Sequence, residues 1–505
     1  MALANETLAA IRYGYGLRPG EPMPGDAAGL LAQVAEGPTR RARFPREGIA
    51  GRRETATRII SLRTAEAKAA REGKPNEDIR KQTQREMQRI YWQDAMARLA
   101  QAVHSPLGFY ERLASFWTDH FSTSALKSLP MRMVVPLYEA EAIRPNIGGS
   151  FSRLLTASIL HPAMLIYLDQ DQNTGVDPAT AQKAGRGLNE NLGRALLEFH
   201  TLGAGSSYTQ SDVRAAALIL TGLSVDNRAL QVVYRPRFAE GGAITLLGRD
   251  YDGDEGEGQD HVLMLEDLAA KPKTAEHICR KLVAHFIADD PPEDLVAPMV
   301  AAWARSQGNL TEVYRAMLTH PRAWAEPGQK IKQPFEFVAS GFRSLGLPES
   351  NFATLLRDMD TVDVEEGPVD KAMKMAGDVA GQMTGQSAGP MGLPTDDEVK
   401  RRSGRASSLT LGALQRMGQP IWQPPSPAGF PDKADLWLSP DQLTERISWS
   451  RMVAKSFGQK MEPSQFLEAA LADAAGPDTR QIISQAPNRL HGITMVLASP
   501  EFNRR

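Results

Sequence analysis

The 505-residue chain contains a single cysteine and no long apolar run. Cys279 cannot form an intrachain disulfide, and its helical spacing within "HICRKLVAHF" predicts a core position rather than a reactive thiol. No stretch approaches the ~18 apolar residues that a membrane span needs. The first residues lack a basic segment followed by a long apolar one, so no signal peptide is expected. These absences predict a soluble cytoplasmic protein.

The chain also lacks an excess of either charge. It has 58 Lys and Arg against 60 Asp and Glu, and a formal net charge of −2. No stripe of basic residues interleaved with aromatic ones provides a local attraction for phosphates. Nucleic acid is therefore not an expected partner.

Several catalytic signatures are missing. The sequence has no glycine-rich phosphate loop, no Cys-x-x-Cys pair, no His-Glu-x-x-His motif and no Gly-x-Ser-x-Gly elbow. The common classes of enzyme are therefore less favoured, and the sequence assigns neither a cofactor nor a metal.

Apolar residues recur at spacings of three and four from Ser105 to about Ala302, which is the helical period. This predicts a mainly α fold: one large multi-helix domain over 1–505, with a small β-hairpin and a flexible insertion. The expected parts are a long polar helix at 54–98, a β-hairpin at 228–248 around Glu240-Gly241-Gly242, a disordered insertion at 358–408, and a proline-rich segment with two or three closing helices at 418–505.

A histidine ends an apolar stripe in "SPLGFYERLASFWTDHFSTS". Tyr110, Leu113, Trp117 and His120 follow one another at steps of three, four and three, so they share one helix face. A buried neutral histidine can be a base, a metal ligand or a hydrogen-bonded core group, and the core role is favoured. Asp119 points elsewhere on this helix.

Charges alternate at strict four-residue spacing in "GLNENLGRALLEFHTLG", where Glu190, Arg194 and Glu198 form a ladder. At 100° per residue the ladder faces away from the main apolar stripe, as a solvated set of ion pairs would. Gly193 and Leu197 flank its other side, and a mid-helix glycine is costly unless a neighbour packs closely. We therefore expect a helix packed on both faces and a ladder inside the protein.

The order of these segments resembles the bacterial domain-of-unknown-function-1800 family over nearly the whole chain. The matching segments are "ALAAIRYGYGLRPGE", "ERLASFWTDHFSTS", "HPAMLIYLDQDQNTG", "LNENLGRALLEFHTLGAGSSYTQSDVRAAALILTG", "YRPRFAEGGAITLLG", "KLVAHFIADDPPEDLV", "KIKQPFEFVASGFRSLG" and "GQPIWQPPSPAGFPD". The resemblance implies a predominantly helical protein. It also implies a partner of the domain-of-unknown-function-1501 type, a secreted protein similar to sulfatases and alkaline phosphatases. Because many relatives carry export signals, a periplasmic location with such a partner stays open.

The chain departs from the family's usual pattern at polar positions. Where the family usually has Phe-Trp-His-Asn-His-Phe, this chain has Thr118 in place of the first histidine and Asp119 in place of the asparagine. Ala195 stands where a glutamate is usual, and Ala239 and Glu240 replace a His-Asp pair. The resemblance implies that a polar site of the family is altered here.

Two hypotheses follow for the function. The favoured one is a structural or adaptor protein that binds a protein partner through its helical surface and the proline-rich segment. The alternative is a hydrolase-like enzyme, with Arg194 as anchor and His120 or a carboxylate as base. Its candidate catalytic residues are His120, Glu190, Arg194 and Glu198, and its candidate substrate-binding residues are Asn191, His200 and Arg237.

Overall fold

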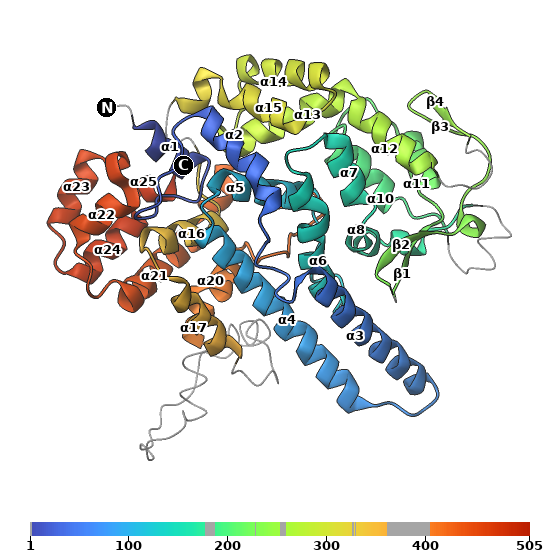
Figure 1. Ribbon diagram of the computed structural model, residues 1–505, viewed down its shortest axis with the longest axis horizontal. Helices are drawn as coiled ribbons and strands as arrows, with labels where there is room; N and C mark the ends of the chain where they lie inside the picture. The colour runs from blue at the N-terminus through green and yellow to red at the C-terminus, as the bar shows by residue number, and fades with distance from the viewer. Residues whose placement is uncertain are drawn as a thin grey trace.

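The computed structural model describes residues 3–176, 187–227, 229–252, 259–325, 328, 330–360 and 404–505. In these residues the chain is mainly α-helical, with two small antiparallel hairpins (Figure 1), which confirms the predicted fold class.

The first half of the chain forms the α3–α4 hairpin and the helices around it. These helices are α1 Asn5–Arg12, α2 Ala27–Glu36, α3 Gly48–Arg71, α4 Glu77–His104, α5 Gly108–His120, α6 Met131–Tyr138, α7 Phe151–Ile159, α8 Pro162–Tyr167, α10 Asn191–Ala195 and α11 Gln210–Ile219.

The second half packs α13 to α15 along one side of the molecule and α21 to α25 at one end (Figure 1). Its helices are α12 Asp260–Ala270, α13 Pro272–Phe286, α14 Glu293–Ser306, α15 Leu310–Leu318, α16 Pro334–Ser344, α17 Glu349–Asp360, α20 Leu411–Arg416, α21 Pro440–Phe457, α22 Pro463–Leu471, α23 Pro477–Ser484, α24 Arg489–Ala498 and α25 Pro500–Asn503.

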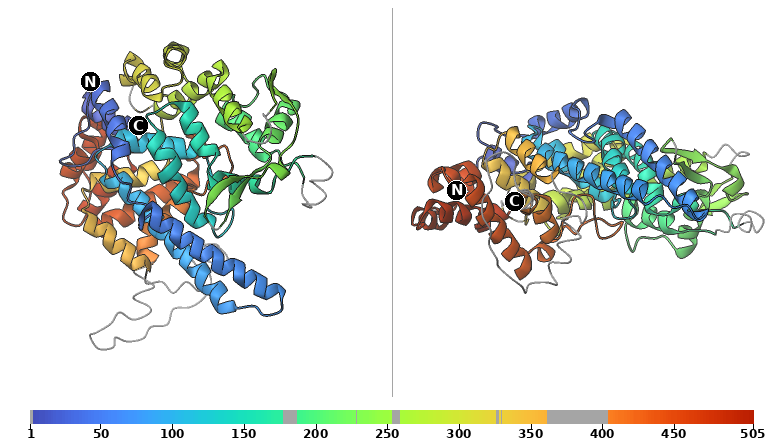
Figure 2. Two further views of the ribbon diagram at one scale, coloured as in Figure 1. Left: turned by 45° about the vertical axis from the view of Figure 1, so that its right-hand side comes forward. Right: turned by 90° about the horizontal axis from the view of Figure 1, so that it is seen from below.

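The predicted polar helix at 54–98 is two helices rather than one. α3 ends before Gly73, which has φ 76°, and the Asn76 side chain caps α4 by accepting the Ile79 N–H at 3.1 Å. A glycine in the left-handed region and an asparagine N-cap are what ends one helix and begins the next. The two helices project from the body as an antiparallel hairpin (Figure 2).

The predicted single hairpin at 228–248 is wrong. β1 Leu223–Asp226 pairs with β2 Gln231–Tyr234, and β3 Ile244–Leu246 pairs with β4 Arg249–Tyr251. The second turn is made by Leu247 and Gly248, whose φ values of 50° and 78° suit a type I′ turn. Alternating apolar residues located two of the strands, but each of them pairs with a neighbour outside the expected hairpin.

Two further predictions concern the later segments. Most of the predicted insertion at 358–408 lies outside the described residues, while its ends at 358–360 and 404–408 are helical. The 418–505 segment closes with α21 to α25, which is more than the two or three helices expected. The proline-rich part lies against other helices through the buried Trp422.

The core contains the predicted stripe of α5. Tyr110, Leu113, Trp117 and His120 are all buried. The Trp117 indole donates to the Tyr314 hydroxyl at 2.7 Å, so the N–H of this fully buried ring has a hydrogen-bond acceptor. Cys279 is fully buried as expected. Among the described residues, no helix combines the length and hydropathy that crossing a membrane requires.

Candidate functional site

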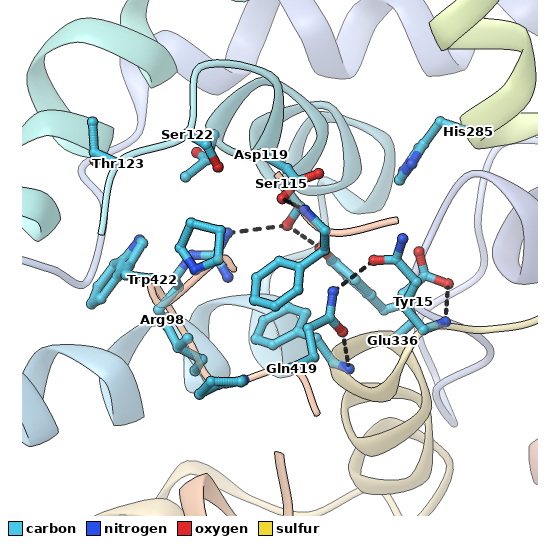
Figure 3. Close-up of a pocket in the computed structure, with 17 residues that line it drawn as sticks. Tyr15, Arg98, Ser115, Asp119, Ser122, Thr123, His285, Glu336, Gln419 and Trp422 are labelled. Carbon is cyan, nitrogen blue, oxygen red and sulfur yellow. Dashed lines mark hydrogen bonds between the residues drawn. The ribbon is translucent and has the colours of Figure 1, made fainter. Parts of the chain in front are cut away.

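A small cavity lies between the last turn of α5 and the proline-rich segment (Figure 3). We call residues 419–430 the strap and the cavity the strap pocket. Its volume is about 60 Å³, which holds a few water molecules. The lining residues are Tyr15, Arg98, Ser115, Thr118, Asp119, Ser122, Thr123, His285, Gln333, Phe335, Glu336, Gln419, Pro420, Ile421, Trp422, Pro424 and Phe430.

The polar wall of the pocket comes from one side of α5 and its continuation. Ser115 and Asp119 are four residues apart on α5, so helical geometry places them on one side of the helix. Ser122 lines the same pocket from the irregular segment that follows the helix. Phe116 and Trp117 point into the core from the other side. The same short segment therefore supplies a core stripe and a polar wall.

Hydrogen bonds to backbone carbonyls of the strap and from the Trp422 side chain hold the strap in place. The Tyr91 hydroxyl donates to the Ile421 carbonyl at 2.6 Å, and the Ala125 N–H donates to the Trp422 carbonyl at 2.9 Å. The Trp422 indole donates to Glu139 at 2.7 Å. Trp422 has φ 55°, a left-handed conformation that costs a bulky residue on the order of 1–2 kcal/mol. Such strain persists only where surrounding contacts hold it.

Asp119 is one of two carboxylates that line the pocket, with Glu336, and the strap approaches it closely. Its Oδ1 accepts the Phe430 N–H at 2.8 Å. Gly429 has φ 87°, and a Cβ there would lie 2.6 Å from the Asp119 Oδ2, so only glycine allows this approach. Burial raises the pKa of Asp119 to about 7. The nearby Asp432 also raises this pKa, whereas the Phe430 N–H and Lys281 lower it.

Arg98 forms the opposite wall. Its Nε donates to Glu139 Oε2 at 2.7 Å, and its guanidinium lies 4.9 Å from the Phe335 ring centre and 5.6 Å from that of Trp422. Because the planar cation stacks on two rings while bound to a carboxylate, its orientation is fixed before any ligand arrives.

His285 is oriented by a carboxylate, as a catalytic base would be. Its Nδ1 lies 2.9 Å from Asp432 Oδ1 and its Nε2 lies 3.2 Å from Arg112 Nη2. Since arginine only donates, Nε2 accepts and Nδ1 donates to Asp432. Burial lowers the pKa of His285 to about 4, with Asp432 acting in the opposite direction, so the ring is neutral at pH 7. Nε2, the nitrogen with which His285 would accept a proton as a base, therefore already accepts a hydrogen bond from Arg112.

Glu336 joins these groups into what we call the buried ionic network, formed by Arg112, His285, Glu336, Asp432 and Arg505. Glu336 Oε1 lies 2.9 Å from Arg112, and Oε2 lies 2.8 Å from Arg505 Nε. Burial alone would raise the pKa of Glu336, but the two arginines hold it below the usual range. The network supports one side of the pocket as a set of paired charges.

Two hydroxyls of the pocket wall lack partners. Ser122 Oγ and Thr118 Oγ1 are buried and make no hydrogen bond within the described part of the chain. Another lining hydroxyl, Ser115 Oγ, lies 2.5 Å from the Tyr15 hydroxyl. An unpaired buried hydroxyl costs about 1–3 kcal/mol, so these atoms require a polar occupant.

The predicted site residues His120 and His200 lie in the core. His120 Nε2 is 3.3 Å from the His200 carbonyl oxygen, and His200 Nδ1 is 3.0 Å from that of His120. Burial lowers the pKa of His120 well below its ordinary value and that of His200 to about 3. Both rings are neutral core groups that pair with each other's backbone, as the favoured interpretation of His120 expects.

The ladder lies at the surface, so its predicted packing inside the protein is wrong. The Arg194 and Glu190 side chains are 43% and 28% exposed and lie 3.3 Å apart. Gln210 from α11 bonds to both of them. Glu198 is half-buried. The structure does not bring the ladder and the enclosed His120 together in one open cleft.

The residues that suggested a buried ladder have another explanation. A Cβ at Gly193 would lie 2.8 Å from the Ala217 nitrogen and 3.0 Å from the Val213 oxygen, because α10 packs directly on α11. Leu197 is buried within a π-helical turn at Leu196–His200, where the 100° rotation no longer holds.

The remaining candidates also lie away from the strap pocket. Asn191 is exposed, and its N–H donates to Asn189 Oδ1 at 2.9 Å. Arg237 is exposed and covers the Phe238 ring at 4.7 Å. Neither lines the strap pocket.

Sequence reasoning missed the residues that do form the pocket. Arg98, Asp119, His285 and Glu336 come from four separate helices, and Asp432 follows the strap. The available signal was the polar run "TDHFSTS" after an apolar helix face, together with the proline-rich stretch. Their proximity is a tertiary property. Within the described residues, no group of three or more His, Cys, Asp or Glu side chains is arranged to hold a metal ion.

A family model described as "Protein of unknown function (DUF1800)" matches residues 9–504. No curated protein and no solved structure matches the chain. Of the positions where the chain departs from the pattern expected for this family, Thr118 and Asp119 line the strap pocket, while Ala195 is buried in α10 and Glu240 accepts the Val176 N–H at 2.6 Å.

Proposed function

The chain belongs to the DUF1800 family of proteins of unknown function, and on that premise we propose that its strap pocket binds a small polar molecule that exchanges a proton with Asp119. The observation that carries this proposal is a carboxyl group with a pKa near 7, placed beside two buried hydroxyls that have no partner. Perturbed titrating groups that converge with polar side chains on a cavity are typical of ligand sites.

The chemistry of the wall favours a ligand with hydroxyl or amine groups. Ser122 and Thr118 can each donate and accept a hydrogen bond, and Asp119 can do either near neutral pH. A carboxyl that titrates near the working pH suits general acid or base catalysis. The hydrolase-like alternative thus moves from the ladder to the strap pocket.

Covalent catalysis receives less support. The Ser115 hydroxyl is paired with Tyr15, and the His285 nitrogen that would activate a nucleophile accepts from Arg112. We therefore propose non-covalent proton transfer or binding alone at this pocket.

A second proposal is the adaptor role, with a partner protein of the domain-of-unknown-function-1501 type. The projecting α3–α4 hairpin favours it, because such an arm offers surface that the body does not cover. The strap itself is less suited to this role, since Trp422 is buried and its indole is bonded to Glu139.

Native mass spectrometry of the full chain tests ligand binding. We expect a small molecule bound to the wild-type protein and lost from Asp119→Asn and from Ser122→Ala. The matched control Glu190→Gln changes a carboxylate of the surface ladder and keeps the ligand. Loss from all three variants, or binding that none of them alters, would contradict the proposal.

Hydrolysis of formamide, methyl acetate and methyl phosphate between pH 5 and 9 tests the proton transfer, because only small substrates suit a cavity of about 60 Å³. We expect turnover of one of them with a rate that changes around pH 7, and a flat profile for Asp119→Asn. A ligand that binds without any turnover leaves binding as the function and rejects the enzyme alternative.

A further inference from the structure

A groove runs along α3 between the projecting hairpin and the body, and we propose that it binds an acidic peptide segment with apolar anchor side chains from a partner protein. Its volume is about 580 Å³, far larger than the strap pocket. The inference rests on the partner-binding proposal and is independent of the strap pocket.

One face of α3 forms a whole side of the groove. Its lining residues on this helix are Ile60, Arg63, Thr64, Ala67, Lys68 and Arg71. These positions repeat at steps of three, one, three, one and three, which describes a single helix face. At 1.5 Å per residue they extend over about 16 Å, a length suited to a peptide of several residues.

The charge on this face is basic. Arg63, Lys68 and Arg71 line the groove, and among the described lining residues only Asp171 is acidic. The Arg63 Nη1 atom is buried and has no hydrogen-bond partner among the described residues. A buried guanidinium nitrogen without an acceptor is costly, so it marks where a carboxylate of the occupant would bind.

The arginines nearer the body differ in this respect. Arg53 lies 2.7 Å from Glu141, and Arg58 lies 2.5 Å from Glu86. Within the protein, α3 thus meets acidic partners along its first half, while the groove half presents cations. Charge complementarity indicates an acidic occupant.

The floor of the groove is apolar. It is formed by Pro130 at the N-cap of α6, Val134 of α6, Ile166 of α8 and Leu230 before β2. Apolar contacts of this kind anchor side chains of a peptide. None of the described residues that line the groove is aromatic, so this lining offers no stacking surface of the kind that single-stranded nucleic acid uses. A peptide with both carboxylate and aliphatic side chains fits both features.

Selection from a random 12-residue peptide display library on the full chain tests the inference. The counter-selection target is the triple variant Arg63→Glu, Lys68→Glu and Arg71→Glu. We expect enriched peptides that combine Asp or Glu with Leu, Ile, Val or Met. By fluorescence anisotropy, a labelled enriched peptide is expected to bind the triple variant at least tenfold more weakly than the wild type.

A matched control separates the groove from general attraction. Arg80→Glu, Lys81→Glu and Arg89→Glu change the charge of the same hairpin by the same amount, but these α4 residues do not line the groove. We expect less than a twofold change in this control. Ala67→Trp, which fills the groove at constant charge, is expected to weaken binding as well.

Three outcomes would overturn the inference. These are enriched peptides without acidic residues, equal weakening in the two charge-reversal variants, or tighter binding of a 20-nucleotide single strand or of anionic vesicles than of any peptide. Acidic peptides that bind all variants equally would place partner binding elsewhere, leaving the adaptor proposal standing without the groove. Circular dichroism of each variant confirms that the arm remains helical.

Discussion

The buried ionic network and the Glu190–Arg194–Glu198 ladder are both clusters of opposite charges, yet they differ in almost every physical respect. The Glu336 side chain is 6% exposed and contacts two arginines from distant segments, whereas the Arg194 side chain is 43% exposed and pairs with Glu190 one turn earlier. Charges from one helix turn can meet without the rest of the fold, while the network exists only after folding. Regular spacing in sequence is therefore a poor guide to which charges are buried.

The largest effect is expected at the network itself. Glu336→Ala leaves Arg112 and Arg505 buried without their carboxylate, so the free energy of unfolding falls by about 3–5 kcal/mol. Urea denaturation measures this change. The control Glu312→Ala, whose pair with Arg315 is half exposed, costs at most about 1 kcal/mol. An equal decrease in the free energy of unfolding of the two variants would contradict the difference between buried and exposed ion pairs.

A pH series tests the pocket carboxylate next to the network. An unfolded aspartate has a pKa near 3.9, and folding raises that of Asp119 to about 7. The folded state thus binds the proton more tightly, so this stabilisation is complete below pH 4 and is lost as pH rises through 7. Between pH 5 and 8 the wild type is expected to lose about 2 kcal/mol more than Asp119→Asn, after allowance for partial solvent screening.

Parallel thermal melts of the wild type and Asp119→Asn across that range provide the measurement. Identical slopes for the two proteins would show that Asp119 is ionised normally. They would then also remove the observation on which the proposed pocket function depends.

Within the ladder helix, the buried glycine is expected to matter more than the charges. Gly193→Ala places a Cβ against the backbone of α11 and costs about 1–2 kcal/mol. Gly241→Ala, where no atom lies within 4 Å of the added carbon, serves as the control in the same denaturation assay. A neutral or stabilising Gly193→Ala would mean that α10 and α11 separate easily.

The smallest effect is expected for the ladder charges. Arg194→Ala removes an exposed pair with Glu190 and lowers the free energy of unfolding by about 0.5 kcal/mol or less. A high-salt denaturation series should reduce even this difference, because exposed pairs are screened. A loss above about 2 kcal/mol would place the ladder in the same class as the network.

The sequence predicted the helical class and much of the local structure. The α5 stripe ending at His120 is buried as its spacing indicates, and Cys279 lies in the core. Such features depend on a period of 3.6 residues, which is visible in any window of the chain. Strand partners and the break at Gly73 were predicted less well, because pairing and helix length depend on neighbours.

The candidate site was only partly predictable. The segment "FWTDHFSTS" indicates a candidate site, but its sequence pattern favours His120 as the candidate residue rather than Asp119. Both are on the last turn of one helix, and helical spacing alone correctly placed them on different sides. Helical spacing contains no information on the strap, whose Phe430 binds the Asp119 carboxylate from 311 residues further along the chain. Burial in the folded protein raises the pKa of Asp119, although the Phe430 N–H itself lowers it.

By itself, then, the sequence determined the mainly helical fold, the apolar faces of its helices and the family to which the chain belongs. The tertiary structure alone decided which charges are buried, which carboxyl titrates near neutral pH and where cavities remain. The physical reason is that periodicity records local geometry, whereas desolvation and ion pairing depend on which distant segments fold against each other.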